Sequence, residues 1–280
     1  MKSLAWLTVL ALVAAACSSA DPSGDLAFPH GAVTVRASSD LAVGRQRLLL
    51  GASLPDGTRL GSETDPVEIE VAPPSDPTDL RSYDAFWVPV VPGVSGLYAA
   101  VVDFDEVGAW TVGLAPEDGS TVRPTVVDVR DRPFTVAVGE PAPVVGSPTL
   151  DDLPLDRLTT DPDPDERLYG MSLADAIGNG TPTVVVFATP AFCQTAACGP
   201  MLDQVKAAID DHPNVDFVHV EVYEGFREPG FAPDTAHLAP AVLAWNLPTE
   251  PWVFVVDGDG TVRARFEGAL GPGELDAALS

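Results

Sequence analysis

The segment that most constrains the fold of this chain runs from Thr183 to Asp203. Its first residues, up to Phe187, are β-branched or aromatic, which is typical of a buried strand. A short turn then leads to Cys193, and a segment with helical spacing that carries Cys198 follows. The pattern therefore predicts a strand that delivers the Cys193 thiol to the start of a helix. There the free backbone N–H groups and the helix dipole favour the nucleophilic thiolate.

The residues around the two cysteines resemble the active-site turn of the thioredoxin-like superfamily. Phe192 precedes Cys193, and Gly199 and Pro200 follow Cys198. The resemblance implies that Cys193 is the nucleophile, that Cys198 resolves the mixed disulfide, and that Phe192 lies at the substrate site. It also implies an enzyme that needs neither cofactor nor metal and exchanges disulfides with proteins that contain thiols or disulfides.

The spacing of the cysteines departs from the superfamily motif, because four residues separate them instead of two. On a regular helix five positions correspond to about 500° of rotation, so the two sulfurs would point ~140° apart. A disulfide requires Cα atoms within roughly 7 Å, so we expect an irregular first turn if the pair oxidises. Some peroxiredoxins have a similar spacing, although Val186 and Pro190 stand where their signature has Pro and Thr. A peroxiredoxin-like peroxidase is therefore an alternative function.

A second part of the superfamily pattern lies downstream. Pro251 precedes the apolar run 252–256, and the sequence Asp-Gly-Asp-Gly follows from Asp257. These turn residues predict a β-hairpin from their conformational preferences alone. The resemblance implies that the bond before Pro251 is cis and that it faces the cysteine turn, which assigns Pro251 and Glu250 to the substrate-binding site.

The first residues have the pattern of a targeting segment. Lys2 supplies a positive charge, residues 4–16 are apolar, and a run of small residues ends at Cys17. The apolar run is shorter than the about 20 residues that span a bilayer. Residues 1–17 resemble a bacterial lipoprotein signal, which implies a lipidated Cys17 and an extracytoplasmic protein anchored in the cell envelope. Ordinary cleavage and secretion is the alternative, since Ala14 stands where that family prefers Leu.

The charge balance limits the partners of the chain. It has 41 acidic and 15 basic residues, a net charge of −26. Such a surface repels nucleic-acid phosphates and anionic lipid headgroups, so we expect no nucleic-acid partner and membrane contact only through the lipid anchor. Without Cys17 the two remaining thiols are Cys193 and Cys198, which can form a redox couple outside the cytosol.

The first half of the chain has the pattern of an all-β domain. Residues 18–31 are rich in Ser, Asp, Pro and Gly and predict a flexible tether. Residues 32–131 contain short alternating runs separated by turn residues, which predicts an antiparallel, immunoglobulin-like β-sandwich. We expect Tyr98 and Trp110 in its core. The predicted strands are 33–37, 46–51, 67–71, 86–90, 97–104, 109–114 and 126–129.

The second half combines strand and helix patterns. Residues 132–164 are rich in Pro and Asp and predict a semi-rigid linker with one strand at 134–138. In residues 165–280 we expect Ser172 as a helix N-cap and an amphipathic helix up to Ile209. The order of elements is β, α, β, α, β, β, α. That order resembles the α/β thioredoxin-like fold, which is the fold predicted for this domain.

Two polar residues alternate on one face of the predicted strand 215–223, His219 and Glu221. The simpler interpretation is a polar strand edge, and the alternative is that Glu221 is a general base toward Cys198. Many thioredoxins have a buried acid on the strand before the cysteines, but residues 183–187 contain none. The histidines show no ligand spacing, so we expect no metal site.

The sequence thus predicts a two-domain, lipid-anchored thiol–disulfide oxidoreductase that uses Cys193 and Cys198. The alternative from another functional class is a non-enzymatic binding lipoprotein. In that case the second domain is a scaffold and the disulfide is structural.

Overall fold

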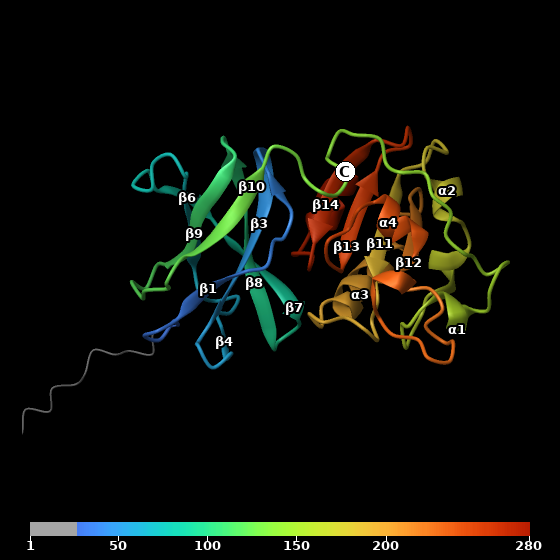
Figure 1. The fold of residues 1–280 in the computed structure, drawn as a ribbon, viewed down its shortest axis with the longest axis horizontal. Coiled ribbons are helices and arrows are strands. Elements are labelled where there is room, and N and C mark those ends of the chain that lie inside the picture. The colour runs from blue at the N-terminus through green and yellow to red at the C-terminus, as the bar shows by residue number, and fades with distance from the viewer. Residues whose placement is uncertain (1–26) are drawn as a thin grey trace, which may run out of the picture.

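The computed structural model describes residues 27–280 (Figure 1). The predicted lipoprotein signal, Cys17 and most of the predicted tether lie outside the described residues. No helix within residues 27–280 has the length and apolar character needed to cross a membrane. Figure 1 shows two units side by side, which we call the N-terminal unit (residues 27–131) and the C-terminal unit (residues 139–280).

The N-terminal unit consists of two five-stranded sheets. Its strands are β1 (Val33–Arg36), β2 (Leu41–Ala42), β3 (Gly44–Ser53), β4 (Arg59–Leu60), β5 (Val67–Ala72), β6 (Arg81–Asp84), β7 (Phe86–Val91), β8 (Ser95–Phe104), β9 (Gly108–Pro116) and β10 (Thr125–Arg130). One sheet has the order β1–β3–β8–β7, with β4 also paired to β3, and the other has the order β2–β10–β9–β5–β6. Their inward-facing side chains form one apolar core between the sheets.

Tyr98 and Trp110 lie in this core, as predicted, with 2% and 0% of their surface exposed. Trp110 packs edge-on against Phe104 with ring centroids 5.0 Å apart, a favoured geometry for aromatic pairs. Its indole N–H donates to the Glu106 carbonyl at 3.0 Å, so the buried polar group is satisfied.

The seven predicted strands of this unit lie in β1, β3, β5, β7, β8, β9 and β10. Three further strands, β2, β4 and β6, have only two to four residues, too few for an alternating pattern to show. The expectation of a purely antiparallel sandwich needs a correction, because β2 and β10 pair in parallel.

The C-terminal unit is built on one four-stranded sheet with the order β12–β11–β13–β14. The strands are β11 (Thr183–Ala188), β12 (Asp216–Glu221), β13 (Trp252–Val256) and β14 (Val262–Glu267). The helices are α1 (Leu155–Leu158), α2 (Leu173–Ala176), α3 (Cys198–Ala208), α4 (Pro240–Ala244) and α5 (Glu274–Leu279), with 3₁₀ turns at Glu166–Tyr169 and Thr235–His237. Strands β11 and β12 are parallel, and the other two pairs are antiparallel.

Apolar cores lie on both faces of this sheet. Every residue of β11 is buried, which explains its unbroken apolar sequence. Val185 and Phe187 pack against α2, α4 and Trp245 on one face. Val184 and Val186 pack against α3 and α5 on the other, in the cluster that contains Cys198. The predicted hairpin at Asp257 is confirmed, since it joins β13 to β14.

The prediction of an α/β thioredoxin-like fold for the C-terminal half is wrong. The structure is mostly β, with 34% strand and 15% helix. Among the described helices only α3 has more than six residues. Proline and glycine account for the difference, because the predicted helical segments contain residues that stop or shorten a helix. The last helix, for example, begins at Glu274, after Gly271, Pro272 and Gly273.

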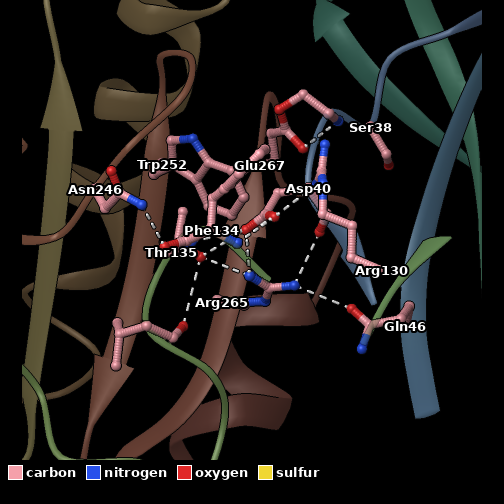
Figure 2. A network of polar contacts seen from close by, with 12 residues as sticks. Ser38, Asp40, Gln46, Arg130, Phe134, Thr135, Asn246, Trp252, Arg265 and Glu267 are labelled. Carbon is pink, nitrogen blue, oxygen red and sulfur yellow. Dashed lines mark hydrogen bonds and ion pairs between the residues drawn. The ribbon is translucent and has the colours of Figure 1, made fainter. Parts of the chain in front are cut away.

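Hydrogen bonds hold the linker between the two units, and its predicted strand at 134–138 does not form. Instead, the backbone N–H groups of Phe134 and Thr135 donate to the Asp40 carboxylate at 2.7 and 3.0 Å. Arg265 of β14 reaches the same carboxylate at 2.8 Å (Figure 2). The side chain of Asp40 is fully buried and that of Arg265 is 10% exposed. One buried ion pair therefore joins the N-terminal unit, the linker and the C-terminal unit.

Removing Arg265 should be costly, because it takes away the closest ionic partner of the buried Asp40 carboxylate and leaves it with Arg130 at 3.4 Å. We expect Arg265→Ala to lower the free energy of unfolding by about 3–5 kcal/mol. Arg132→Ala, which removes an exposed ion pair with Glu140, is the matched control and should cost less than about 1 kcal/mol. Urea unfolding of both variants measures the difference. Equal, small losses would contradict the role of Asp40 and Arg265 in joining the units.

Candidate functional site

Cys193 and Cys198 form a disulfide between the end of β11 and the start of α3, with their Cα atoms 6.0 Å apart. The expectation that the helix starts at Cys193 is corrected, because α3 begins at Cys198. Residues 193–197 form an irregular turn, which is what a disulfide at this spacing requires. Within it Ala196 has a φ of 59°, a left-handed conformation that turns the chain back toward Cys193.

The two sulfurs have different surroundings. Cys198 is fully buried, whereas Cys193 is only partly buried. The backbone N–H of Cys198, at the first turn of α3, donates to Cys193 Sγ at 3.2 Å. The hydroxyl oxygen of Thr195 lies 3.4 Å from the same sulfur. An incoming thiolate can therefore reach Cys193, and a Cys193 thiolate has hydrogen-bond donors at a helix N-terminus to stabilise it.

The Glu250–Pro251 peptide bond is cis, as predicted. It precedes β13, whose first residue, Trp252, pairs with Phe187 of β11. Burial raises the pKa of Glu250, and the backbone N–H of Gln194 opposes that rise. Glu250 therefore lies beside the cysteine turn, as expected of a residue at the substrate site.

A groove of about 510 Å³ begins at the cysteine turn. Gln194, Thr195 and Ala197 line it from that turn, and Thr249 and Glu250 line it from the loop before Pro251. The rest of its lining comes from the N-terminal unit. The volume falls in the range of sites that bind ligands.

Phe192 does not line this groove. Its ring packs against Phe231, with centroids 5.0 Å apart, and edge-on against Tyr223 at 6.1 Å. This aromatic cluster lies beside the core that contains Val218 and Val220. The structure therefore places Glu250 in a groove lined by the residues next to the two cysteines, and it places Phe192 in packing on the opposite face of the sheet.

Glu221 is a buried acid at the end of β12. Its Oε2 accepts hydrogen bonds from the backbone N–H and the hydroxyl of Thr160, both at 2.8 Å. Its Oε1 has no partner among the described residues. Burial is the largest influence on this carboxyl and raises its pKa to about 7. It therefore titrates close to neutral pH.

Glu221 shares a sheet face with Cys198. Phe217, four residues earlier on β12, belongs to the apolar cluster that contains Cys198, and side chains of one strand alternate between faces. The hydroxyl of Thr160 also accepts from the backbone N–H of Ala191 at 3.1 Å. A chain of two hydrogen bonds thus links the cysteine turn to the Glu221 carboxyl.

His219 lies on the same face and is 3% exposed. Its Nε2 must donate to the Ala188 carbonyl at 3.1 Å, so its Nδ1 accepts from the Tyr169 hydroxyl at 2.7 Å. Burial lowers the pKa of His219 to about 4, so the ring is neutral near pH 7. Both ring nitrogens are occupied, which leaves none to bind a metal. His219 instead fixes the end of β11 ahead of the cysteines.

The interpretation of His219 and Glu221 as a polar strand edge is wrong, since both are more than nine-tenths buried. Strand β12 is the edge strand of the sheet, but Tyr169 and Thr160 reach the two side chains from the segment before β11. The sequence signal for Glu221 was its alternation with apolar neighbours. Nothing in the sequence pointed to Thr160, which lies in the predicted linker. Across residues 27–280 no group of three or more His, Cys, Asp or Glu is placed to hold a metal ion.

Comparisons with known proteins do not identify a family for this chain. No family model matches the sequence, and a search of curated proteins gives no match either. Among solved structures, the chain is similar to the crystal structure of the Lin-41 filamin domain, with 19% identity and a TM-score of 0.24. That match covers 38% of this chain and 96% of the other. A TM-score this low supports no conclusion about the fold or the function.

The pKa of Glu221 should make the stability depend on pH. Because the pKa is about 7 in the folded chain and 4.5 ordinarily, the folded state keeps a proton that the unfolded state has lost between those values. Stability should therefore fall as the pH rises from about 4.5 to about 7, by roughly 3 kcal/mol at most. A glutamine side chain has no proton to lose in this range. Glu221→Gln should therefore remove the part of the decrease in stability that the Glu221 carboxyl causes.

Urea unfolding at pH 5 and pH 8 measures the effect. The exposed Glu117→Gln, which makes the same chemical change on the N-terminal unit, is the control and should keep the wild-type pH dependence. If Glu221→Gln also keeps it, the buried carboxyl does not carry the titration.

Proposed function

We propose that the chain is a thiol–disulfide oxidoreductase that acts on proteins through Cys193 and Cys198. The observation that carries the proposal is the asymmetry of the two sulfurs. Cys193 is partly exposed and directly precedes the groove-lining residues Gln194 and Thr195, whereas Cys198 is fully buried at the start of α3. Because the predicted thioredoxin-like fold is wrong, the geometry of the two cysteines supports the proposal and the fold class does not.

The chemistry follows from that asymmetry. A substrate thiolate attacks Cys193 Sγ, a mixed disulfide forms, and the bond to Cys198 breaks with Cys198 leaving as a thiolate. A second substrate thiolate then attacks the substrate sulfur of the mixed disulfide and releases reduced Cys193. The substrate dithiol loses two electrons and the cysteine pair gains them. The same steps in reverse reduce a substrate disulfide.

Glu221 has the properties of the group that exchanges a proton with Cys198. It lies on the same sheet face, its pKa of about 7 matches a proton transfer near neutral pH, and its Oε1 is unpaired in the described residues. The link through Thr160 to Ala191 fixes the carboxyl relative to the cysteine turn.

A purely structural disulfide is the competing explanation. Its loop is short, so it restricts the unfolded chain little and stabilises the fold less than a long-range bridge. The reduction potential separates the two roles. We expect a value between about −270 and −120 mV in a glutathione or dithiothreitol redox buffer, whereas a structural disulfide lies below about −300 mV.

Trapping tests the roles of the two cysteines. Cys193 of the Cys198→Ser variant is first converted by an aromatic disulfide to its mixed disulfide with the aromatic thiol. A thiolate of a reduced, unfolded protein then attacks Cys193 Sγ and releases the aromatic thiol, and the protein–protein mixed disulfide should accumulate on non-reducing gels, because no resolving thiol remains. Cys193→Ser, in which the remaining thiol is buried, should not. If neither variant traps the substrate and the potential is below the redox range, the scaffold alternative replaces this proposal. Rapid consumption of hydrogen peroxide by the wild type would instead favour the peroxidase.

We also propose that the protein is an extracytoplasmic lipoprotein anchored through Cys17, which lies outside the described residues. What supports this is the sequence of residues 1–17. Metabolic labelling with a fatty acid should mark the wild type, and Cys17→Ser should lose the label and leave the membrane fraction. A label that survives Cys17→Ser would contradict the anchor, and Cys193→Ser, which keeps Cys17, is the control.

A further inference from the structure

We infer that the N-terminal unit forms the second wall of the substrate site, and that it selects client segments carrying a carboxylate among apolar residues near the reacting cysteine. This inference rests on the proposed function and names the substrate class of the same site. It is carried by the packing of the cysteine turn on the N-terminal unit, by the lining of the groove and by the charges along it.

The cysteine turn packs directly on the N-terminal unit. Ala197, which precedes Cys198, is 3% exposed and belongs to an apolar cluster with residues of the other unit. That cluster contains Leu49 of β3, Val88 and Val90 of β7, and Ala99 of β8. The outer face of this sheet is therefore covered in part by the disulfide turn itself.

The groove continues along that same sheet. On its far side the wall is made of apolar side chains from β1, β7 and β8 and the residues next to them. They are Val35, Ala37, Val90 and Leu97. Val35 is 43% exposed, because no other part of the described chain covers it. A segment whose cysteine reacts with Cys193 would lie against this wall.

Two arginines, Arg36 and Arg59, line the groove on the side of the N-terminal unit. No ion pair between either of them and an acidic side chain occurs within residues 27–280, and Arg59 donates only to the Ser95 hydroxyl at 3.1 Å. Unpaired guanidinium groups pair strongly with carboxylates, so the wall suits an acidic residue of the client.

The opposite wall limits where that acidic residue lies. Glu250 lines the groove beside the cysteine turn, and a client carboxylate next to the reacting cysteine would meet it. The second acid of the lining, Glu267, already accepts hydrogen bonds from Ser39 and Thr249. The client carboxylate should therefore lie a few residues from its cysteine, on the side of Arg36 and Arg59.

The two walls are bonded to each other. Glu267 of β14 accepts from the backbone N–H of Ser39 in the N-terminal unit at 2.8 Å. It also accepts from the Thr249 hydroxyl at 2.7 Å, two residues before Pro251. Thr249 in turn accepts from the Trp252 indole N–H at 3.1 Å. The groove is thus formed before a client binds, which lowers the entropy cost of binding.

The test uses the full chain with Cys198→Ser and Cys193 loaded with an aromatic thiol. A peptide thiolate that attacks Cys193 Sγ forms a mixed disulfide and releases the coloured aromatic thiol, which is followed by absorbance. Two peptides share one cysteine and the same apolar residues, and differ in Asp or Lys a few positions from the cysteine. Near 0.15 M salt, where charges more than ~8 Å apart are screened, the Asp peptide should react about tenfold faster.

Removing the arginines should abolish this preference. Arg36→Ala with Arg59→Ala changes two exposed side chains, so the protein should fold, and Arg45→Ala with Arg123→Ala is a control with the same change of charge away from the groove. The control should keep the preference for the Asp peptide. Arg36→Glu with Arg59→Glu should invert it. The small dithiol dithiothreitol should react equally with all variants.

Each outcome of these experiments supports or overturns a named part of the inference. No preference in the parent, or a preference for the Lys peptide, overturns the selection of acidic clients, since the net charge of −26 favours basic peptides on its own. A preference for Asp that survives in Arg36→Ala with Arg59→Ala overturns the role of the two arginines. Both results leave the oxidoreductase proposal intact if dithiothreitol reduces the wild-type disulfide quickly. A wild-type disulfide that resists dithiothreitol overturns the proposed function itself.

Discussion

The arrangement of the molecule depends on the buried ion pair between Asp40 and Arg265. Asp40 lies in the N-terminal unit with its side chain fully buried, and it accepts from Arg265 of β14 and from the backbone of Phe134 and Thr135. Burying a carboxylate is costly unless its oxygens are bonded, so these bonds favour the observed orientation of the two units. A second largely buried ion pair, between Arg47 of β3 and Glu274 of α5 at 2.6 Å, acts in the same direction. Because the groove at the disulfide has one wall from each unit, it exists only in this orientation.

The same orientation shapes the cysteine turn. A turn with four residues between the cysteines cannot close a disulfide as a regular helix, and Ala196 in a left-handed conformation provides the reversal that it needs. Such a conformation is unfavourable for a residue with a side chain. Its neighbour Ala197 is held in an apolar cluster with β3, β7 and β8. Contact with the N-terminal unit therefore stabilises the turn that carries the sulfurs.

Features set by local sequence could be predicted, and features set by distant contacts could not. The alternating runs identified seven strands and the Asp-Gly repeats identified the hairpin, whereas the cis bond before Pro251 was predicted only from the resemblance to a known superfamily. Helices were overestimated, because the amphipathic spacing was clear but prolines and glycines stop the segments early. The groove joins residues more than a hundred positions apart, such as Arg36 and Gln194, and no local pattern reports such a contact.

The strand before the cysteines has no acid, and the nearest element of the sheet that supplies a buried one is β12, with Glu221. In the parallel pair β11–β12, Glu221 lies opposite Ala188, whose small side chain leaves room beside it on the Cys198 face. Thr160, from the segment that precedes the sheet, bonds to both the carboxyl and the backbone of Ala191. If the proposed function holds, the proton acceptor for Cys198 comes from the neighbouring strand, and the residue that positions it comes from the linker that joins the two units.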